Sequence, residues 1–170
     1  KIGVGLSDPK ESIVTTGDIR EHTSYFLPQV VHLATNGVNV TGSSWQNLQS
    51  FTLPAGTLND SSAIRIVAYV RRSSGGGAGA FRLRYGGSTV VSMSANGNNP
   101  ARLELVLFNT TDASSQRGFI DHSNSGNTGT ATGTSSVDSE SNQTLSLEID
   151  LSTIADDWIC DYLLVELVKK

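Results

Sequence analysis

The residues able to do acid–base, nucleophilic or metal chemistry are few and scattered along the chain. There are three histidines, His22, His32 and His122, and one cysteine, Cys160. No histidine has a second ligand at the helical i, i+4 spacing, and one cysteine cannot complete a zinc site. Cys160 lies in an apolar stretch, where a buried thiol behaves as a small hydrophobic residue. These residue types therefore predict no zinc site and no catalytic triad.

Carboxylate pairs are the remaining candidates for catalysis, because a glycosidase uses two carboxyl groups that flank the scissile bond. Asp156 with Asp157, or Asp60 with Asp121, are the pairs that a fold would have to bring together. Asp156 and Asp157 directly precede Trp158, at the expected turn into the last strand, where aspartates are ordinary turn formers. The sequence thus predicts no catalytic residue and a protein that is not an enzyme.

Two kinds of loop have the composition of a ligand motif but not its spacing. The oxygen-rich loops at 59–62 and 156–157 lack the Asp-x-Asp-x-Asp-Gly pattern of a calcium-binding loop. The glycine run within 75–79 is not followed by the Gly-Lys-Ser/Thr of a phosphate-binding loop. We therefore expect no metal and no cofactor.

A sugar-binding surface needs exposed aromatic rings surrounded by hydroxyl and amide groups. Trp45 lies in a polar, loop-like stretch, and Tyr69 falls on the polar side of an alternating strand pattern. Both are predicted ligand-binding residues, with the loops at 73–79 and 96–100 as further contact points. The alternative is that Trp45 covers the end of the core and Tyr69 packs against a partner subunit.

The composition excludes several classes of partner. Of the 170 residues only 16% are charged, against about 25% in an average globular protein, and the formal net charge is −4. Without a basic field, nucleic acid is not an expected partner. No apolar run approaches the roughly 20 residues of a membrane-spanning helix, and the first residues lack the apolar core of a signal peptide. Because residue 1 is lysine, we expect that an upstream piece was removed or is missing from this numbering.

Short β-type runs bounded by turn residues follow one another from residue 29 onward. In the run from Ala63 to Arg72 every even position from 64 to 70 is apolar, while the odd positions include Arg65 and Arg71, which is typical of a strand with one buried face. Gly86-Gly87 predicts a tight hairpin. The predicted strands are Gln29–Thr35, Leu48–Leu53, Ala63–Arg72, Ala80–Tyr85, Ser88–Ser94, Ala101–Asn109, Gln116–His122, Thr128–Val137, Thr144–Ile149 and Trp158–Val168. In the last of these, Ile159, Leu163, Val165 and Leu167 are the expected core residues.

This pattern without intervening helices predicts one all-β domain, an antiparallel jelly-roll-like β-sandwich at residues 29–170. Residues 1–28 have no sustained period and contain several Gly and Pro, which predicts an irregular N-terminal arm or linker. The segment 122–143 has few large apolar side chains, so the sequence leaves open whether it is disordered or an outer strand.

Residues 45–170 resemble surface modules of tailed bacteriophages. The likeness rests on Leu53-Pro54-Ala55 at a strand end followed by a long strand with alternating Arg, on the hairpin Phe81–Val90, and on Asp161–Leu167. These are packing and turn motifs, and they specify fold more than activity.

The resemblance implies a non-enzymatic structural protein on the virion surface, such as a head fibre, a capsid decoration protein or a tail-fibre component. Its implied partners are other virion proteins, in a homotrimer attached through the arm at 1–28. The alternative is a receptor- or glycan-binding tip domain of a tail fibre or spike, which serves host attachment by contacting a host surface glycan. The resemblance transfers no catalytic residue onto this chain.

Overall fold

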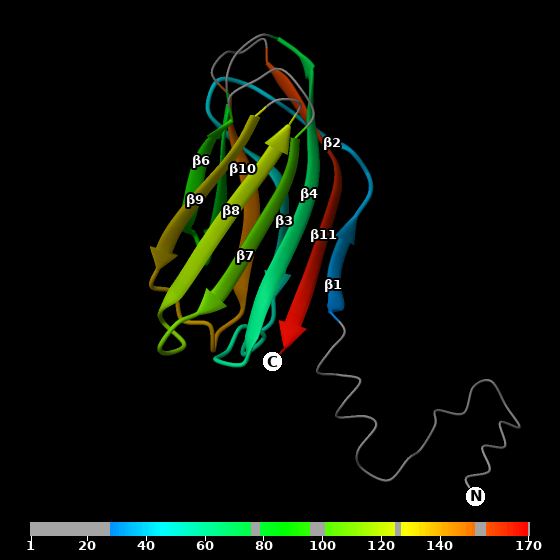
Figure 1. Cartoon of the computed structure of the whole chain (residues 1–170). Coiled ribbons are helices and arrows are strands. Elements are labelled where there is room, and N and C mark those ends of the chain that lie inside the picture. Colours follow the sequence, from blue (N-terminus) through cyan, green and yellow to red (C-terminus); the bar gives the residue numbers. More distant parts are fainter. Residues whose placement is uncertain (1–27, 76–78, 96–100, 125–126, 152–155, 170) are drawn as a thin grey trace, which may run out of the picture.

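A computed structural model describes residues 28–75, 79–95, 101–124, 127–151 and 156–169, which form eleven strands and no helix (Figure 1). The predicted arm at 1–28 lies outside this part of the chain except for Pro28. No helix long and apolar enough to span a membrane occurs in the described residues. The strands are β1 (Gln29–Ala34), β2 (Val38–Thr41), β3 (Trp45–Leu53), β4 (Ser62–Ser74), β5 (Gly79–Tyr85), β6 (Ser88–Ala95), β7 (Ala101–Asn109), β8 (Gln116–Asn124), β9 (Asn127–Ser135), β10 (Gln143–Leu151) and β11 (Asp157–Lys169).

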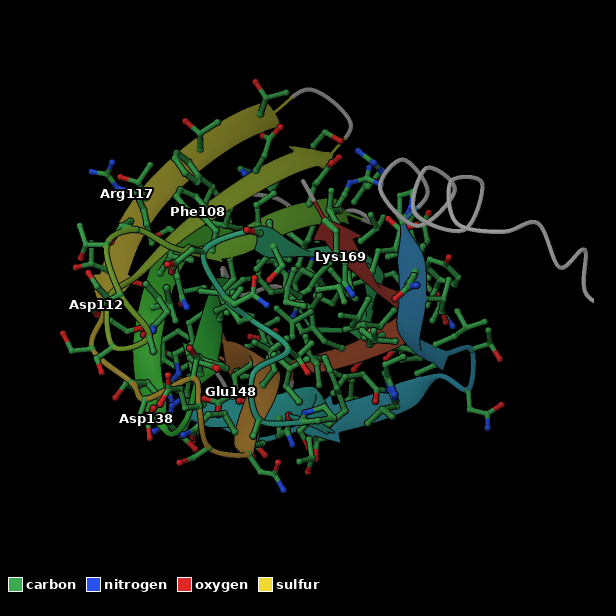
Figure 2. All side chains as sticks on the ribbon, turned by 90° about the horizontal axis from the view of Figure 1, so that it is seen from below. Phe108, Asp112, Arg117, Asp138, Glu148 and Lys169 are labelled. Atoms are coloured by element: carbon green, nitrogen blue, oxygen red, sulfur yellow. The ribbon has the colours of Figure 1, made fainter. Side chains whose placement is uncertain are left out.

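The strands form two antiparallel sheets that pack face to face, so the predicted β-sandwich is confirmed. The seven-stranded sheet has the order β1-β11-β4-β7-β8-β9, with β2 also paired to β11. The four-stranded sheet has the order β3-β10-β5-β6. Figure 2 views this sandwich along its length, with Phe108 on the side of the larger sheet and Glu148 on the side of the smaller one.

The core lies between the sheets and follows the alternation that the sequence predicts. In β4 the side chains of Ile64, Ile66, Ala68 and Val70 are buried, while Tyr69 between them is exposed. Leucines at alternate positions of β7 and β10 are buried in the same way. Each sheet therefore contributes one apolar face, and burial of these faces is the main favourable term in folding.

One part of the core differs from the expected pattern. The sequence predicts Ile159 as a core residue together with Leu163, but Ile159 is only half-buried, whereas Trp158 and Cys160 are 1% exposed. The pairing of β11 with β4 shifts register between Cys160 and Tyr162. A β-bulge adds one residue to a strand and so moves the inward phase by one position, which explains the difference.

For the segment 122–143 the sequence leaves open disorder or an outer strand, and the structure shows that Asn127–Ser135 form the outer strand β9. Its sequence is NTGTATGTS, with exposed threonines facing outward and Gly129, Ala131 and Gly133 facing the other sheet. A Cβ atom on Gly133 would overlap the main-chain carbonyl oxygen of Val90 on β6. The segment is poor in large apolar residues because β6 approaches too closely to leave room for them.

A network of buried amides ties the loops at the lower end of Figure 1 together. The Gln116 side chain is 1% exposed, and its Nε2 donates to Asn109 Oδ1 (3.2 Å), Ala113 O (2.9 Å) and Val137 O (2.8 Å). Its Oε1 accepts from the Val137 N–H (2.9 Å) and from Ser135 Oγ (3.1 Å). One side chain thus satisfies several groups that burial would otherwise leave without partners.

The structure confirms one predicted turn and differs from the sequence prediction at one short strand and at Trp45. Gly86 and Gly87 have φ of 55° and 80°, which confirms the predicted hairpin because both central residues need positive φ. Strand β2 is absent from the predicted strands, since it has only four residues. The sequence predicts Trp45 in a loop, but it is the first residue of β3, where it pairs with Asp150.

Candidate functional site

The two predicted ligand-binding aromatics lie on opposite layers of the sandwich. Trp45 is on the outer side of the four-stranded sheet, in register with Asp150 of β10. Tyr69 is 42% exposed on the outer side of the seven-stranded sheet, between Arg102 of β7 and Tyr162 of β11. They therefore cannot contact one ligand together, and each must be judged with its own neighbours.

The outer side of the four-stranded sheet, which we call the polar face, carries almost only hydroxyl, amide and charged groups. Strand alternation fixes which side chains point outward. They are Trp45, Asn47, Ser50 and Thr52 of β3, Thr144, Ser146, Glu148 and Asp150 of β10, Ala80, Arg82 and Arg84 of β5, and Thr89, Ser92 and Ser94 of β6.

Glu148 is the centre of the polar face. It lies on the central strand β10, with a side chain only 11% exposed. Arg82 Nε donates to its Oε2 at 2.6 Å, and Arg84 Nη1 donates to its Oε1 at 3.3 Å. Arg84 Nη2 also donates to the carbonyl oxygen of Gly87 in the β5–β6 hairpin. Because both carboxylate oxygens already accept from protein donors, Glu148 fixes the positions of the two arginines.

Trp45 is joined to this ion cluster. The Arg82 guanidinium lies over the indole ring, with its central carbon 3.9 Å from the ring centroid. Trp45 is on β3 and Arg82 is on β5, and β10 runs between them, so the two side chains meet over the central strand. Such a cation–π contact holds the ring in place. It also covers one face of the indole, so a sugar can stack only on the opposite face.

A depression of about 410 Å³ opens in the polar face beside the ion cluster. Its wall contains Asn47, Ser50, Ser146 and Glu148 from the two neighbouring strands, together with Arg84. The other lining residues come from the adjoining turns and are Gly86, Gly87, Asn142, Gln143 and Thr144. No apolar side chain is among these lining residues. Such a surface offers hydrogen-bond donors and acceptors to a hydroxyl-rich ligand and little to an apolar one.

The outer face of the seven-stranded sheet has a different character around Tyr69. Arg65 donates to Glu104 at 2.7 Å and to Glu166 at 2.9 Å, and Arg102 donates to Glu104 at 2.8 Å. The hydrogen bond from Arg65 lowers the pKa of Glu104. The exposed side chains of Val30, Leu33 and Phe119 lie on the same sheet. This face mixes exposed apolar side chains with ion pairs, and the register partners of Tyr69 are Arg102 and Tyr162 rather than amide residues.

The remaining candidates for chemistry are not brought together. Asp60 precedes the first residue of β4, whereas Asp121 is two strands away and is in register, through Glu104, with Val67 in the middle of β4. Asp156 and Asp157 are neighbours in the chain at the start of β11. Asp121 is on the outer face, paired with Glu104 and Thr130. Burial raises the pKa of the Cys160 thiol to about 11, so it stays protonated at neutral pH. In the described part of the chain, no three His, Cys, Asp or Glu residues are arranged to hold a metal.

Comparisons with known proteins find no matching family model and no matching curated protein. Two solved structures are similar to this chain at a low level. The C-terminal domain of EclA, described as a sugar-binding protein, matches over 81% of each chain, at 12% identity and a TM-score of 0.43. A lectin from Bauhinia forficata in complex with GalNAc matches over 83% of this chain and 94% of its own, at 8% identity and a TM-score of 0.39. Both likenesses are loose, and no conclusion about a ligand of this chain rests on them.

Sequence reasoning singled out Trp45 as a candidate but not the residues that surround it. Arg82 and Arg84 alternate with buried Phe81 and Leu83 on β5, and Glu148 has the same outward phase on β10. The sequence signal for this cluster was a pair of strands with alternating burial, of which one carries arginines and the other a glutamate at outward positions. The pairing of β5 with β10 was needed to show that these charges meet, because the two strands are separated by more than fifty residues in the chain.

Proposed function

We propose that this domain is a non-enzymatic recognition module that binds a glycan on the polar face. The observation that carries the proposal is the depression of about 410 Å³, lined only by polar side chains and glycines and flanked by the Trp45–Arg82–Glu148 cluster. Sugar hydroxyls both donate and accept hydrogen bonds, which matches a wall of amides, hydroxyls and guanidinium groups. The indole of Trp45 is only half-buried, and its exposed part offers an apolar surface for the C–H groups of a sugar ring.

The fixed geometry of the cluster supports binding. Arg82 and Arg84 are held by Glu148, so their donors are already oriented before a ligand arrives. Preorganised side chains lose less conformational entropy on binding than free ones. Because both oxygens of Glu148 accept from arginines, the same arrangement supports binding rather than catalysis.

The test is glycan binding by matched variants. We expect the domain to bind a subset of glycans on an array, and Trp45→Ala to weaken the strongest of these by about tenfold, the equivalent of about 1.4 kcal/mol. Tyr69→Ala removes an aromatic ring from the opposite sheet and should leave the affinity unchanged. Affinity is measured by isothermal titration calorimetry. Absence of any bound glycan, or loss of binding in Tyr69→Ala with retention in Trp45→Ala, would contradict the proposal.

We further propose that this module is displayed on the surface of a tailed-bacteriophage particle. The support is the resemblance of residues 45–170, including the Leu53-Pro54-Ala55 strand end and the Gly86-Gly87 hairpin, to phage surface modules. In this setting residues 1–28 attach the domain as a homotrimer to other virion proteins, and the polar face points toward the host.

Electron microscopy of antibody-labelled particles tests this placement. We expect label on the head or tail surface in groups of three copies, with tail labelling expected if the polar face contacts a host receptor. Particles without label, from a preparation in which the antibody detects the free domain, would refute the virion placement and leave glycan binding to be judged separately.

A further inference from the structure

A second hollow, separate from the depression in the polar face, lies at the seam where the edges of the two sheets meet. It has a volume of about 310 Å³ and is lined by Met93 and Ser94 of β6, His122 of β8, and Thr128, Gly129, Thr130 and Ala131 of β9. Strands β6 and β9 are the last strands of their sheets and belong to different sheets. The hollow is therefore open between two strand edges, which is a place where a small molecule can enter.

The hollow has an inner and an outer zone. Met93 and His122 are buried at 9% and 5% exposure, and Gly129 and Ala131 face inward with them. Ser94, Thr128 and Thr130 are exposed at the rim. The floor is thus largely apolar with a single imidazole, and three polar residues lie at the rim.

His122 is a buried group whose hydrogen bonding is incomplete. Its Nδ1 lies 3.3 Å from the carbonyl oxygen of Gly129, and its Nε2 is buried without a partner among the described protein atoms. A carbonyl oxygen can only accept, so Nδ1 is the donor in this contact, and in the tautomer that carries its proton on Nδ1 the Nε2 atom presents a lone pair. A buried acceptor without a donor costs free energy, and a ligand hydroxyl that donates to it would recover that loss.

Gly129 has no side chain, and this leaves room for the imidazole. A Cβ atom on Gly129 would come within 2.8 Å of His122 Cε1 and 3.4 Å of the Met93 methyl carbon. Both side chains therefore lie directly over this glycine. The place of the histidine ring is set by the fold rather than by a ligand. Because Nε2 is closed off from solvent, a ligand hydroxyl reaches it only when a neighbouring side chain moves aside.

We propose that this seam binds a small neutral polyol of monosaccharide size, with one hydroxyl donating to His122 Nε2 and the rest of the molecule lying at the mouth formed by Ser94, Thr128 and Thr130. The volume is at the lower end of known ligand sites, which excludes an oligosaccharide inside the hollow. The apolar floor suits the C–H face of such a molecule, and the absence of a charged group among the lining residues favours a neutral one. This inference does not depend on the polar-face proposal.

The chain carries its own reporter for this site, because Met93 is its only methionine. Labelling the methionine methyl with ¹³C gives one NMR signal that arises from the floor of the hollow. Titration with D-glucose, D-galactose, D-mannose and glycerol is expected to shift this signal in a saturable way for at least one probe. The Kd is expected in the millimolar range, as for small ligands in general.

Four variants decide the outcome. His122→Phe keeps a ring but removes the acceptor, and it should abolish the saturable shift. Ala131→Val fills the floor without changing His122 and should abolish it as well. His32→Phe is the matched control, since His32 also has a buried, unpartnered Nε2 but stacks on Phe51 near the opposite edge of the sandwich. Trp45→Ala should also keep the shift, which separates this site from the polar face.

Two results would overturn the proposal. If no probe shifts the Met93 signal, the hollow takes up water only, because ordered water can also donate to a buried nitrogen. If the shift is the same in His122→Phe and Ala131→Val as in the unchanged protein, the probe binds elsewhere.

Discussion

Replacing Trp158 with alanine is expected to lower the free energy of unfolding by about 3–5 kcal/mol. Trp158 is 1% exposed and meets Phe81 of the opposite sheet edge to face, with ring centroids 5.6 Å apart. The substitution removes the largest buried side chain of the core and leaves a cavity between two rigid sheets that cannot close around it. Urea unfolding followed by far-ultraviolet circular dichroism measures the loss.

The chain offers a matched control, since Trp45 is its only other tryptophan. Trp45 is half-buried on the outer surface, so Trp45→Ala deletes the same atoms without opening a cavity. Its cost is expected to stay below about 1.5 kcal/mol, mainly from the lost contact with Arg82. Equal losses in the two variants would contradict the view that the sheets meet around Trp158.

The second large effect is expected for Gln116→Leu, which should cost about 3 kcal/mol or more. Leucine has a similar volume but no polar atoms. The change would remove the partners of Val137 N, Val137 O and Ala113 O, which are bonded to this one amide. Each buried group left unpaired costs about 1–3 kcal/mol. Denaturant unfolding gives the total, and hydrogen exchange at the Val137 amide reports the local opening.

Gln46→Leu is the control for this change. Gln46 donates to Ser44 at 3.3 Å in an exposed position, where water can replace the lost bond. The expected change is within about 0.5 kcal/mol. If Gln116→Leu were equally mild, the loops at the lower end would be held by something other than the amide network.

The strands could be predicted well because their signal is local. Ile64, Ile66, Ala68 and Val70 recur at every second position, with Arg65 and Tyr69 between them, and this period of two is typical of a strand with one buried face. The errors arise where the determinant is not local. The inward phase of Trp158 depends on a bulge against β4, and the glycine-rich strand β9 depends on the close approach of β6 to Gly133. Neither the bulge nor the close approach of β6 can be inferred from the residues of the strand itself.

The candidate sites were less predictable for the same reason. Trp45 could be singled out as an aromatic residue in a polar stretch, but the arginine that covers it lies on another strand. His122 was noted only as a histidine without ligands, because its unpaired nitrogen follows from its position opposite Gly129. When the residues of a site lie on different strands, they can be recognised as one site only after the pairing of those strands is known.

The pairing of β1 with β11 has a mechanical consequence. Gln29 and Leu167 are ladder partners, so the points where the chain enters and leaves the sandwich lie about 5 Å apart. A polypeptide that continues beyond both points would carry the domain as a pendant at one place along its length. Tension along that polypeptide would act on the β1–β11 ladder at its end, one residue pair at a time. The four-stranded sheet, and with it the polar face, would remain outside the loaded path.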